Sequence, residues 1–169
     1  ALPILPADGK ILKFPTGAYG ATPEDWVGTV AKEDLKSAVD FAVDGHVYVL
    51  LRDGRVLDFL RSRLKTTFAP AIIPPLSNAT SIVAEPNQAF IYLLHGPDGR
   101  ILRLTRDGAL TQQITAGDAA DRLRGAIGLT VDEEKSIAYV LTETSVVTVR
   151  LPAPPASSDK VTPTAGETR

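Results

Sequence analysis

Residues 98–104 read Asp-Gly-Arg-Ile-Leu-Arg-Leu, which is a turn followed by a short alternating strand pattern. Related segments occupy residues 8–14 (Asp-Gly-Lys-Ile-Leu-Lys-Phe), residues 53–59 (Asp-Gly-Arg-Val-Leu-Asp-Phe) and, in divergent form, residues 144–149 (Thr-Ser-Val-Val-Thr-Val). The three Asp-Gly turns follow one another at steps of 45 residues, and Val146 lies 45 residues after Ile101. A strand pattern that returns at one fixed step predicts an internally repeated fold.

Two further strand patterns recur within this repeat. Residues 35–44, 76–85 and 123–132 each begin with leucine, place a small residue three positions later, and end a short apolar strand on an acid. A strand centred on a tyrosine follows each of them, around Tyr48, Tyr92 and Tyr139. The unit is completed by an Asp-Gly turn, a third strand, and an outer strand such as residues 109–114. Four antiparallel strands at a period of about 45 residues are typical of one blade of a β-propeller, so we predict an all-β fold of such blades.

The strand count predicts an incomplete ring of about three and a half blades. We expect the blades at residues 1–34 (partial, without its inner strand), 35–75, 76–122 and 123–151 (partial, ending after its third strand), which together form a propeller segment over residues 1–151. Residues 152–169 are rich in Pro, Ser and Thr, which predicts a flexible tail. The sequence contains no methionine, so Ala1 is not a translation start, and we expect the chain to be a processed or excised piece of a longer protein.

Residues 43–50 with 53–55, and residues 90–94 with 98–100, resemble the repeats of NHL-type and related six-bladed β-propellers. In such repeats a strand ending in an acid precedes an apolar-tyrosine strand and a turn of the Asp-Gly-Arg kind. The resemblance implies architecture and not activity, because propellers host lactonases, receptors and scaffolds alike. A closed propeller has about 4 to 8 blades. We therefore expect the missing blades to come from upstream sequence, from a second copy of the chain, or from a protein partner.

The overall composition narrows the classes of partner. The net charge is -2, and the Lys and Arg residues are scattered, so no basic patch indicates binding to nucleic acid or to an anionic membrane surface. No apolar run approaches the roughly 20 residues that a bilayer-spanning helix needs. The absence of cysteine excludes disulfides, a thiolate zinc site and a cysteine nucleophile, although it does not select a compartment.

Three acids are candidate metal ligands. Asp44, Glu85 and Asp132 end three successive inner strands, so they can form a ring at one mouth of a central channel. Such a ring of carboxylates suits Ca²⁺. Acids at this position also accept hydrogen bonds from the turn that follows, and we favour this structural role. No cofactor is expected otherwise.

The segment 95–98, which contains His95 and Asp98, is the longest turn between a second and a third strand. Turns of this kind lie on the same face as the connections between blades, so His95 and Asp98 are our candidates for a binding loop. His46 precedes its tyrosine strand whereas His95 follows its own, which places the two histidines at opposite ends of their blades. A shared two-histidine metal site is therefore not expected.

Two local expectations concern polar residues. Thr22, Pro23 and the acids Glu24 and Asp25 follow the pattern of a helix start, with a capping residue, proline at the first helical position, and acids in the first turn. The basic residues of the third strands alternate with apolar ones, which predicts a sheet face turned to water. These residues are Lys10, Lys13, Arg55, Arg100 and Arg103.

The sequence favours a non-catalytic binding or scaffolding module that interacts through its loop face or through its open blade edges. The alternative is a calcium-dependent propeller hydrolase of lactonase type, whose active site would be completed by missing blades. A lactonase-like site needs Glu, Asn and Asp to converge from several blades. The only two asparagines, Asn78 and Asn87, are expected on opposite faces, so this constellation is not visible.

Overall fold

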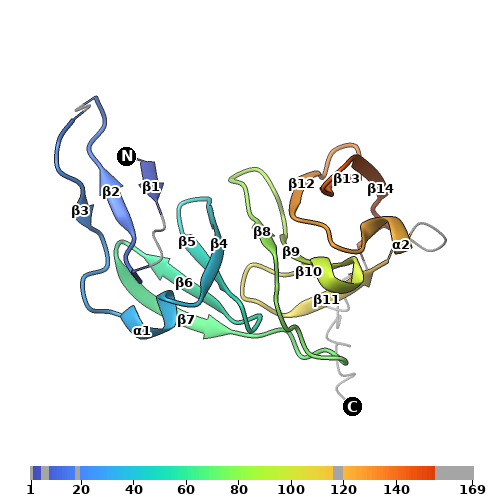
Figure 1. Cartoon of the computed structure of the whole chain (residues 1–169), viewed down its shortest axis with the longest axis horizontal. Helices are drawn as coiled ribbons and strands as arrows, with labels where there is room; N and C mark the ends of the chain where they lie inside the picture. Colours follow the sequence, from blue (N-terminus) through green and yellow to red (C-terminus); the bar gives the residue numbers. More distant parts are fainter. Residues whose placement is uncertain (1, 5–7, 18–19, 116–119, 155–169) are drawn as a thin grey trace, which may run out of the picture.

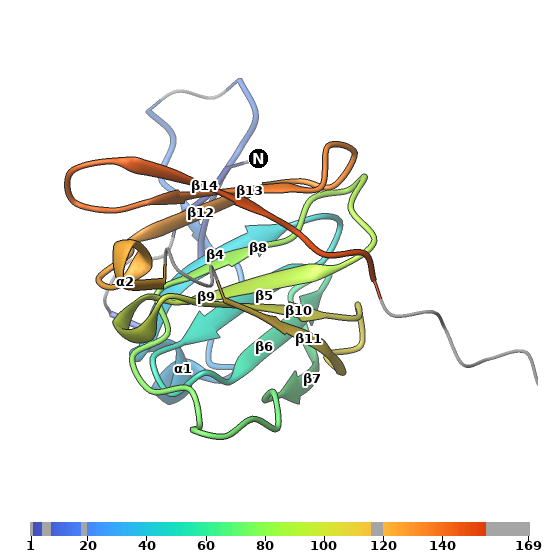
Figure 2. The ribbon, with the colours of Figure 1, turned by 90° about the vertical axis from the view of Figure 1, so that its right-hand side faces the viewer.

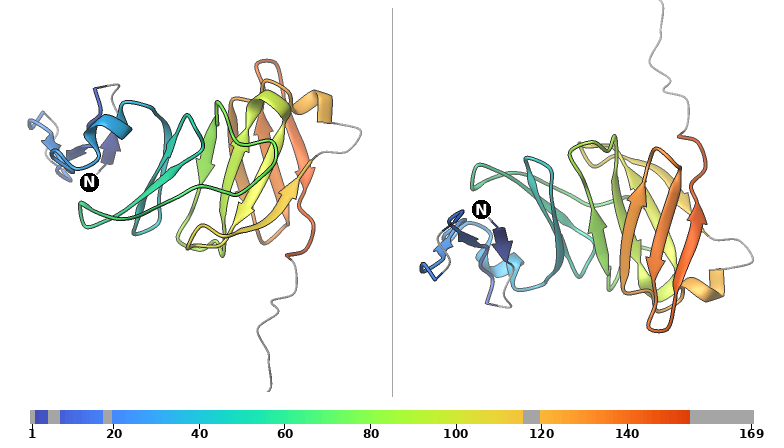
Figure 3. Two further views of the ribbon diagram at one scale, coloured as in Figure 1. Left: turned by 90° about the horizontal axis from the view of Figure 1, so that it is seen from below. Right: turned by 90° about the horizontal axis from the view of Figure 1, so that it is seen from above.

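A computed structural model describes residues 2–4, 8–17, 20–115 and 120–154 of the chain. In this part of the chain, four antiparallel sheets follow one another in chain order and fan out as an arc (Figures 1 and 3). The innermost strands of neighbouring sheets contact one another, β4 with β8 and β8 with β12. This is the arrangement of propeller blades around an axis, and the ring is not closed.

The four blades consist of the following strands. Blade 1 contains β1 (Leu2–Ile4), β2 (Leu12–Phe14) and β3 (Glu24–Asp25); blade 2 contains β4 (Ala38–Val43), β5 (Val47–Leu51), β6 (Val56–Leu60) and β7 (Arg63–Phe68). Blade 3 contains β8 (Ser81–Val83), β9 (Ile91–His95), β10 (Arg100–Leu104) and β11 (Leu110–Ile114); blade 4 contains β12 (Gly128–Asp132), β13 (Ile137–Leu141) and β14 (Val146–Arg150). Each strand pairs with its neighbour in sequence, as expected for a meander. The predicted blades of four antiparallel strands are confirmed for blades 2 and 3.

In the part of the chain that the structure describes, three short helical segments connect the strands. α1 (Lys32–Leu35) precedes blade 2, η1 (Gly96–Asp98) joins β9 to β10, and α2 (Ala120–Leu123) precedes blade 4. The helix start that the sequence suggested at residues 22–25 is wrong, because Glu24 and Asp25 form β3 and pair with Lys13 and Leu12 of β2. Ordered pairing with an open sheet edge satisfies the backbone groups there and outweighs the local helix pattern. The predicted tail from residue 155 onward lies outside the described residues.

The hydrophobic cores lie between the blades. Figure 2 views the molecule from the side of blade 4 and shows the sheets as successive layers. Tyr48 and Leu50 of blade 2 pack with Ile91 and Leu93 of blade 3 in one core, and an equivalent core joins blade 3 to blade 4. A third core joins blade 1 to blade 2 around Phe59. The two middle strands of an internal blade therefore lie between two cores and are buried on both faces.

The repeated Asp-Gly turn has a steric cause. Gly9 and Gly54 adopt φ values of +76° and +87°, which residues with a side chain rarely adopt. A Cβ on Gly54 would lie 2.4 Å from the Cβ of Leu76, and a Cβ on Gly9 would lie 2.5 Å from the carbonyl oxygen of Lys32. The turn thus needs glycine both for its backbone angle and for the close approach of the connection to the next blade.

Candidate functional site

The turns that follow the inner strands gather at one end of the blades, and they contain the three acids proposed as calcium ligands. Asp44 accepts a hydrogen bond from the backbone N–H of His46 at 3.0 Å, and Asp132 accepts one from the N–H of Lys135 at 2.9 Å. The Glu85 side chain is exposed, and its carbonyl oxygen accepts a hydrogen bond from Gln88. Asp44 and Asp132 thus accept hydrogen bonds from the turns that follow them, and a calcium-binding role for the three acids stays a prediction.

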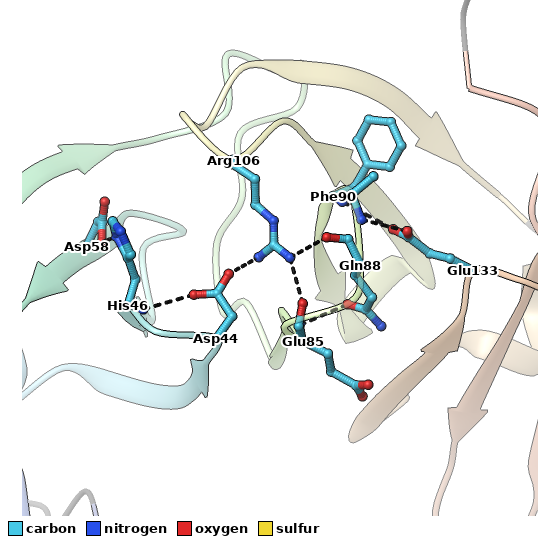
Figure 4. Close-up of polar contacts among 9 residues, drawn as sticks. Asp44, His46, Asp58, Glu85, Gln88, Phe90, Arg106 and Glu133 are labelled. Carbon is cyan, nitrogen blue, oxygen red and sulfur yellow. Dashed lines mark hydrogen bonds and ion pairs between the residues drawn. The ribbon is translucent and has the colours of Figure 1, made fainter.

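Arg106 joins the turns of blades 2 and 3 (Figure 4). It lies in the turn between β10 and β11, and its guanidinium forms an ion pair with Asp44. The same group donates to the carbonyl oxygens of Glu85 at 2.7 Å and Gln88 at 2.5 Å. A cation of the chain itself thus occupies the carboxylate of Asp44, whereas at Glu85 it contacts the backbone and not the proposed carboxylate ligand. In the described part of the chain, no three His, Asp or Glu residues come together in a way that could hold a metal ion.

His46 forms a pair with Asp58 that the sequence analysis missed. Its Nδ1 lies 2.6 Å from Oδ1 of Asp58, whose side chain is only 3% exposed, and its ring stacks on Tyr48 at a centroid distance of 5.7 Å. The buried carboxylate holds the imidazole in one orientation. The pair borders a hollow of about 550 Å³, which Lys65 and Arg106 also line. The signal in the sequence is an exchange of charge, because Asp58 occupies the repeat position that is basic at Lys13 and Arg103.

A different set of residues joins blade 3 to blade 4 at the same end of the molecule. Glu133 accepts hydrogen bonds from the N–H groups of Ala89 at 2.7 Å and Phe90 at 3.2 Å, and from the hydroxyl of Tyr92 at 2.9 Å. Burial and the hydrogen bond to Glu133 raise the pKa of Tyr92 to about 12. Arg103 lies over both aromatic rings, 5.4 Å from the centroid of Phe90 and 5.7 Å from that of Tyr92.

His95 and Asp98, the candidate binding-loop residues, are held by the chain itself at the opposite end of blade 3. His95 is 5% exposed, with Nδ1 at 2.5 Å from Oδ1 of Asp98 and Nε2 at 2.5 Å from the carbonyl oxygen of Ser77. Nε of Arg100 lies 2.7 Å from the other oxygen of Asp98. Partial burial opposes ionisation of Asp98, but the hydrogen bonds from His95 and Arg100 outweigh it and lower the pKa of Asp98. A ligand role for this turn stays a prediction, and the contacts clamp it to the connection between blades 2 and 3.

The expectation that the basic residues of the third strands face water is wrong for two of them. Arg100 is 7% exposed and Arg103 is 3% exposed, because neighbouring segments cover both faces of blade 3. Arg103 donates to the side chain of Gln112 at 2.9 Å and to the carbonyl oxygen of Pro152 at 3.0 Å. β10, the third strand of this internal blade, is buried along its whole length and thus has no face that is free for solvent.

Blade 4 carries an apolar face that no other described segment covers. The face is formed by Tyr139, Leu141 and Val146, and we call it the blade 4 face. Leu141 and Val146 are cross-strand partners, and they are 46% and 60% exposed. The corresponding partners are Leu50 with Val56 in blade 2 and Leu94 with Ile101 in blade 3, and all four of these residues are fully buried. The corresponding tyrosines, Tyr48 and Tyr92, are 2% and 1% exposed.

The fold is similar to that of several solved structures. A chain of a nidogen/laminin complex has a TM-score of 0.58 and 17% identity, over 81% of this chain and 51% of that chain. Virginiamycin B lyase from Staphylococcus aureus has a TM-score of 0.55 and 12% identity, over 88% of this chain and 50% of the lyase. Hydrazine synthase from Kuenenia stuttgartiensis has a TM-score of 0.50 and 11% identity, over 77% of this chain and 33% of the synthase.

These similarities support the propeller fold, and they do not distinguish NHL-type repeats from other propellers. The chain spans between a third and about half of the length of these structures. No family model and no curated protein matches the sequence. Among the described residues, no helix has the length and apolar content that a membrane crossing requires.

Proposed function

We propose that the chain is a non-catalytic binding and scaffolding module of the β-propeller class, and that the blade 4 face is its binding surface. The observation that carries this proposal is the exposure of Leu141 and Val146, at positions that internal blades bury completely. Apolar side chains gathered on one face of a sheet mark an interaction site. The blade 4 face is one such group.

The polar groups of the chain also support a binding role over a catalytic one. The guanidinium of Arg106 donates hydrogen bonds to groups of blades 2 and 3, and Glu133 accepts three hydrogen bonds from blade 3. Both ring nitrogens of His95 face acceptors within the chain. Side chains that lock blades together stiffen the arc, which keeps its exposed face in one shape for a partner.

Site-specific photocrosslinking tests this proposal. A photoreactive amino acid at position 141 places the reactive group on the blade 4 face, and the same amino acid at position 64 is the matched control. Leu64 is 38% exposed and lies on β7, the outer strand of blade 2. In the cells that produce the protein, we expect a discrete crosslinked species from position 141 and none from position 64.

Two results would contradict the binding module. One is an equal absence of crosslinks from both positions. The other is turnover of ester or lactone substrates together with a calcium-dependent rise in melting temperature, which would favour the propeller hydrolase. The purified chain without added calcium is the control for the second measurement.

A further inference from the structure

Blade 1 carries the counterpart of the blade 4 face, and it is half-buried. Leu12 and Phe14 of β2 lie on the side of the strand opposite to Ile11, which packs toward blade 2. Both side chains are only half-buried, and we call them the blade 1 face. The residues at the same repeat positions are Leu57 and Phe59 in blade 2 and Leu102 and Leu104 in blade 3, and all four are at most 1% exposed.

Each internal junction unites one face of each kind. Between blades 2 and 3, Leu50 and Val56 pack in the same core as Leu102 and Leu104. Between blades 3 and 4, Leu94 and Ile101 pack in the same core as Val147 and Val149, which follow the same alternation in β14. The blade 4 face occupies the repeat positions of Leu50 and Val56. The blade 1 face occupies the repeat positions of Leu102 and Leu104. The two ends of the chain are therefore complementary to each other.

We infer that the partner of the blade 4 face is the blade 1 face of a second copy of this chain. The contact continues the series of blade junctions that the chain already contains. Because the two faces differ, it is a head-to-tail contact, which builds a ring when the rotation closes. Two copies supply two such contacts and eight sheets, which agrees with the upper end of the range of about 4 to 8 blades in closed propellers. This inference rests on the proposed function and names its partner.

The position that holds a charged residue in each internal junction is neutral in blade 4. Asp58 in blade 2 and Arg103 in blade 3 correspond to Thr148 of β14 in the repeat. An uncharged position needs no ion-pair partner across the contact, so the second copy does not have to supply one. The blade 4 face can thus be completed by apolar packing against Leu12 and Phe14 of the other copy.

Sedimentation and light scattering of the purified chain test the inference over a range of concentrations. We expect a monomer–dimer equilibrium, with a dimer of twice the 18.0 kDa mass of the chain. The double variant Leu141→Asp/Val146→Asp should stay monomeric at concentrations where the parent chain is mostly dimeric. The matched control Leu64→Asp should dimerise like the parent. Far-ultraviolet circular dichroism establishes that both variants fold.

Thiol crosslinking tests the head-to-tail arrangement, since the chain has no cysteine of its own. One preparation carries Leu12→Cys and the other carries Val146→Cys, and a short thiol-reactive crosslinker is added to each one and to their mixture. We expect crosslinked dimers only in the mixture. Crosslinking of the Val146→Cys preparation with itself would overturn the arrangement, as would open-ended polymers or a chain that stays monomeric up to its solubility limit.

The outcomes separate this inference from the proposed function. A monomeric chain whose position 141 crosslinks to a different protein in cells would overturn the second copy and leave the binding module standing. An absence of crosslinks from position 141 would contradict both the second copy as partner and the binding module. A crosslinked species with twice the mass of the chain would support both.

Discussion

At the scale of single residues, charged side chains in this protein act as ties between blades. Arg106 crosses from blade 3 to Asp44 of blade 2, and Glu133 crosses from blade 4 to Tyr92 of blade 3. The carboxylate of Asp44 is only 10% exposed, so the loss of its cation would leave a desolvated charge. Ties of this kind are sensitive to the removal of one partner.

Replacement of Arg106 by glutamine should lower the free energy of unfolding by about 1–3 kcal/mol, because Asp44 and two carbonyl groups lose their charged donor. Urea denaturation followed by circular dichroism measures the change. The matched control is Lys135→Gln, which removes an ion pair with Asp132 in which the lysine side chain is 69% exposed. The control variant should lower the free energy of unfolding by about 0–1 kcal/mol. Equal costs for the two variants would contradict the role of Arg106 as a tie.

The raised pKa of Tyr92 predicts a loss of stability at alkaline pH. An ordinary tyrosine has a pKa of 10.0, whereas in the folded protein the pKa of Tyr92 is about 12. Between these values the unfolded chain releases the phenol proton and the folded chain retains it, so stability falls as the pH rises. The variant Tyr92→Phe lacks this contribution. The stability advantage of the parent chain over the variant should therefore shrink from pH 10 to about pH 12 in urea titrations. A constant difference across this range would argue against the raised pKa.

At the scale of the element, the Asp-Gly turn is the feature that fixes the repeat. Alanine in place of Gly54 has to adopt a φ of +87° and bring its Cβ within 2.4 Å of Leu76. Gly125 is the matched control, because its φ is +73° and an added Cβ would meet nothing within 4 Å. We expect Gly125→Ala to cost about 1 kcal/mol of backbone strain and Gly54→Ala to cost about 1–3 kcal/mol more. Thermal unfolding of the two variants measures the difference, and similar melting temperatures would refute the steric cause.

Strand order in the blades could be predicted from the sequence, because the 45-residue step and the alternation of apolar residues repeat together. The same alternation wrongly predicts exposed side chains at Arg100 and Arg103. It identifies residues that share a face, but an internal blade has both faces covered, so a polar position need not be solvated. The expected helix at residues 22–25 failed for another reason, since pairing with β2 is a tertiary effect that local propensity does not contain.

The candidate site was harder to predict than the strands, because its contacts join separate blades. Arg106 and Asp44 are 62 residues apart in the sequence, and Glu133 and Tyr92 are 41 residues apart. The repeat shows which residues occupy equivalent positions, whereas each junction uses a different pair of charges. Alternation alone indicates neither which residue of the next blade lies opposite nor which charge it carries.

At the scale of the whole molecule, the blades form a row, and the cores among the described residues join blades that are neighbours in the chain. Among the described residues, hydrophobic cores lie on both faces of blades 2 and 3 and on one face each of blades 1 and 4. In such a row, stability is a sum of contributions from the units and from their junctions. The end blades, with one junction each, are therefore the first to open.

Hydrogen exchange at the middle strands of blades 3 and 4 measures this difference. β9 and β13 both pair with a strand on each side, so their amides have equivalent backbone hydrogen bonds. They differ in whether a neighbouring blade packs on both faces of the sheet or on one. In dilute solution the amides of β9 should exchange at least about tenfold more slowly than those of β13.

A second copy on the blade 4 face adds the missing junction, so exchange in β13 should slow as the protein concentration rises, while exchange in β9 stays unchanged. The variant Leu141→Asp/Val146→Asp should show no such dependence. Equal exchange of β9 and β13 in dilute solution would show that the blades open as one unit. The exposed face would then not lower the local stability of blade 4.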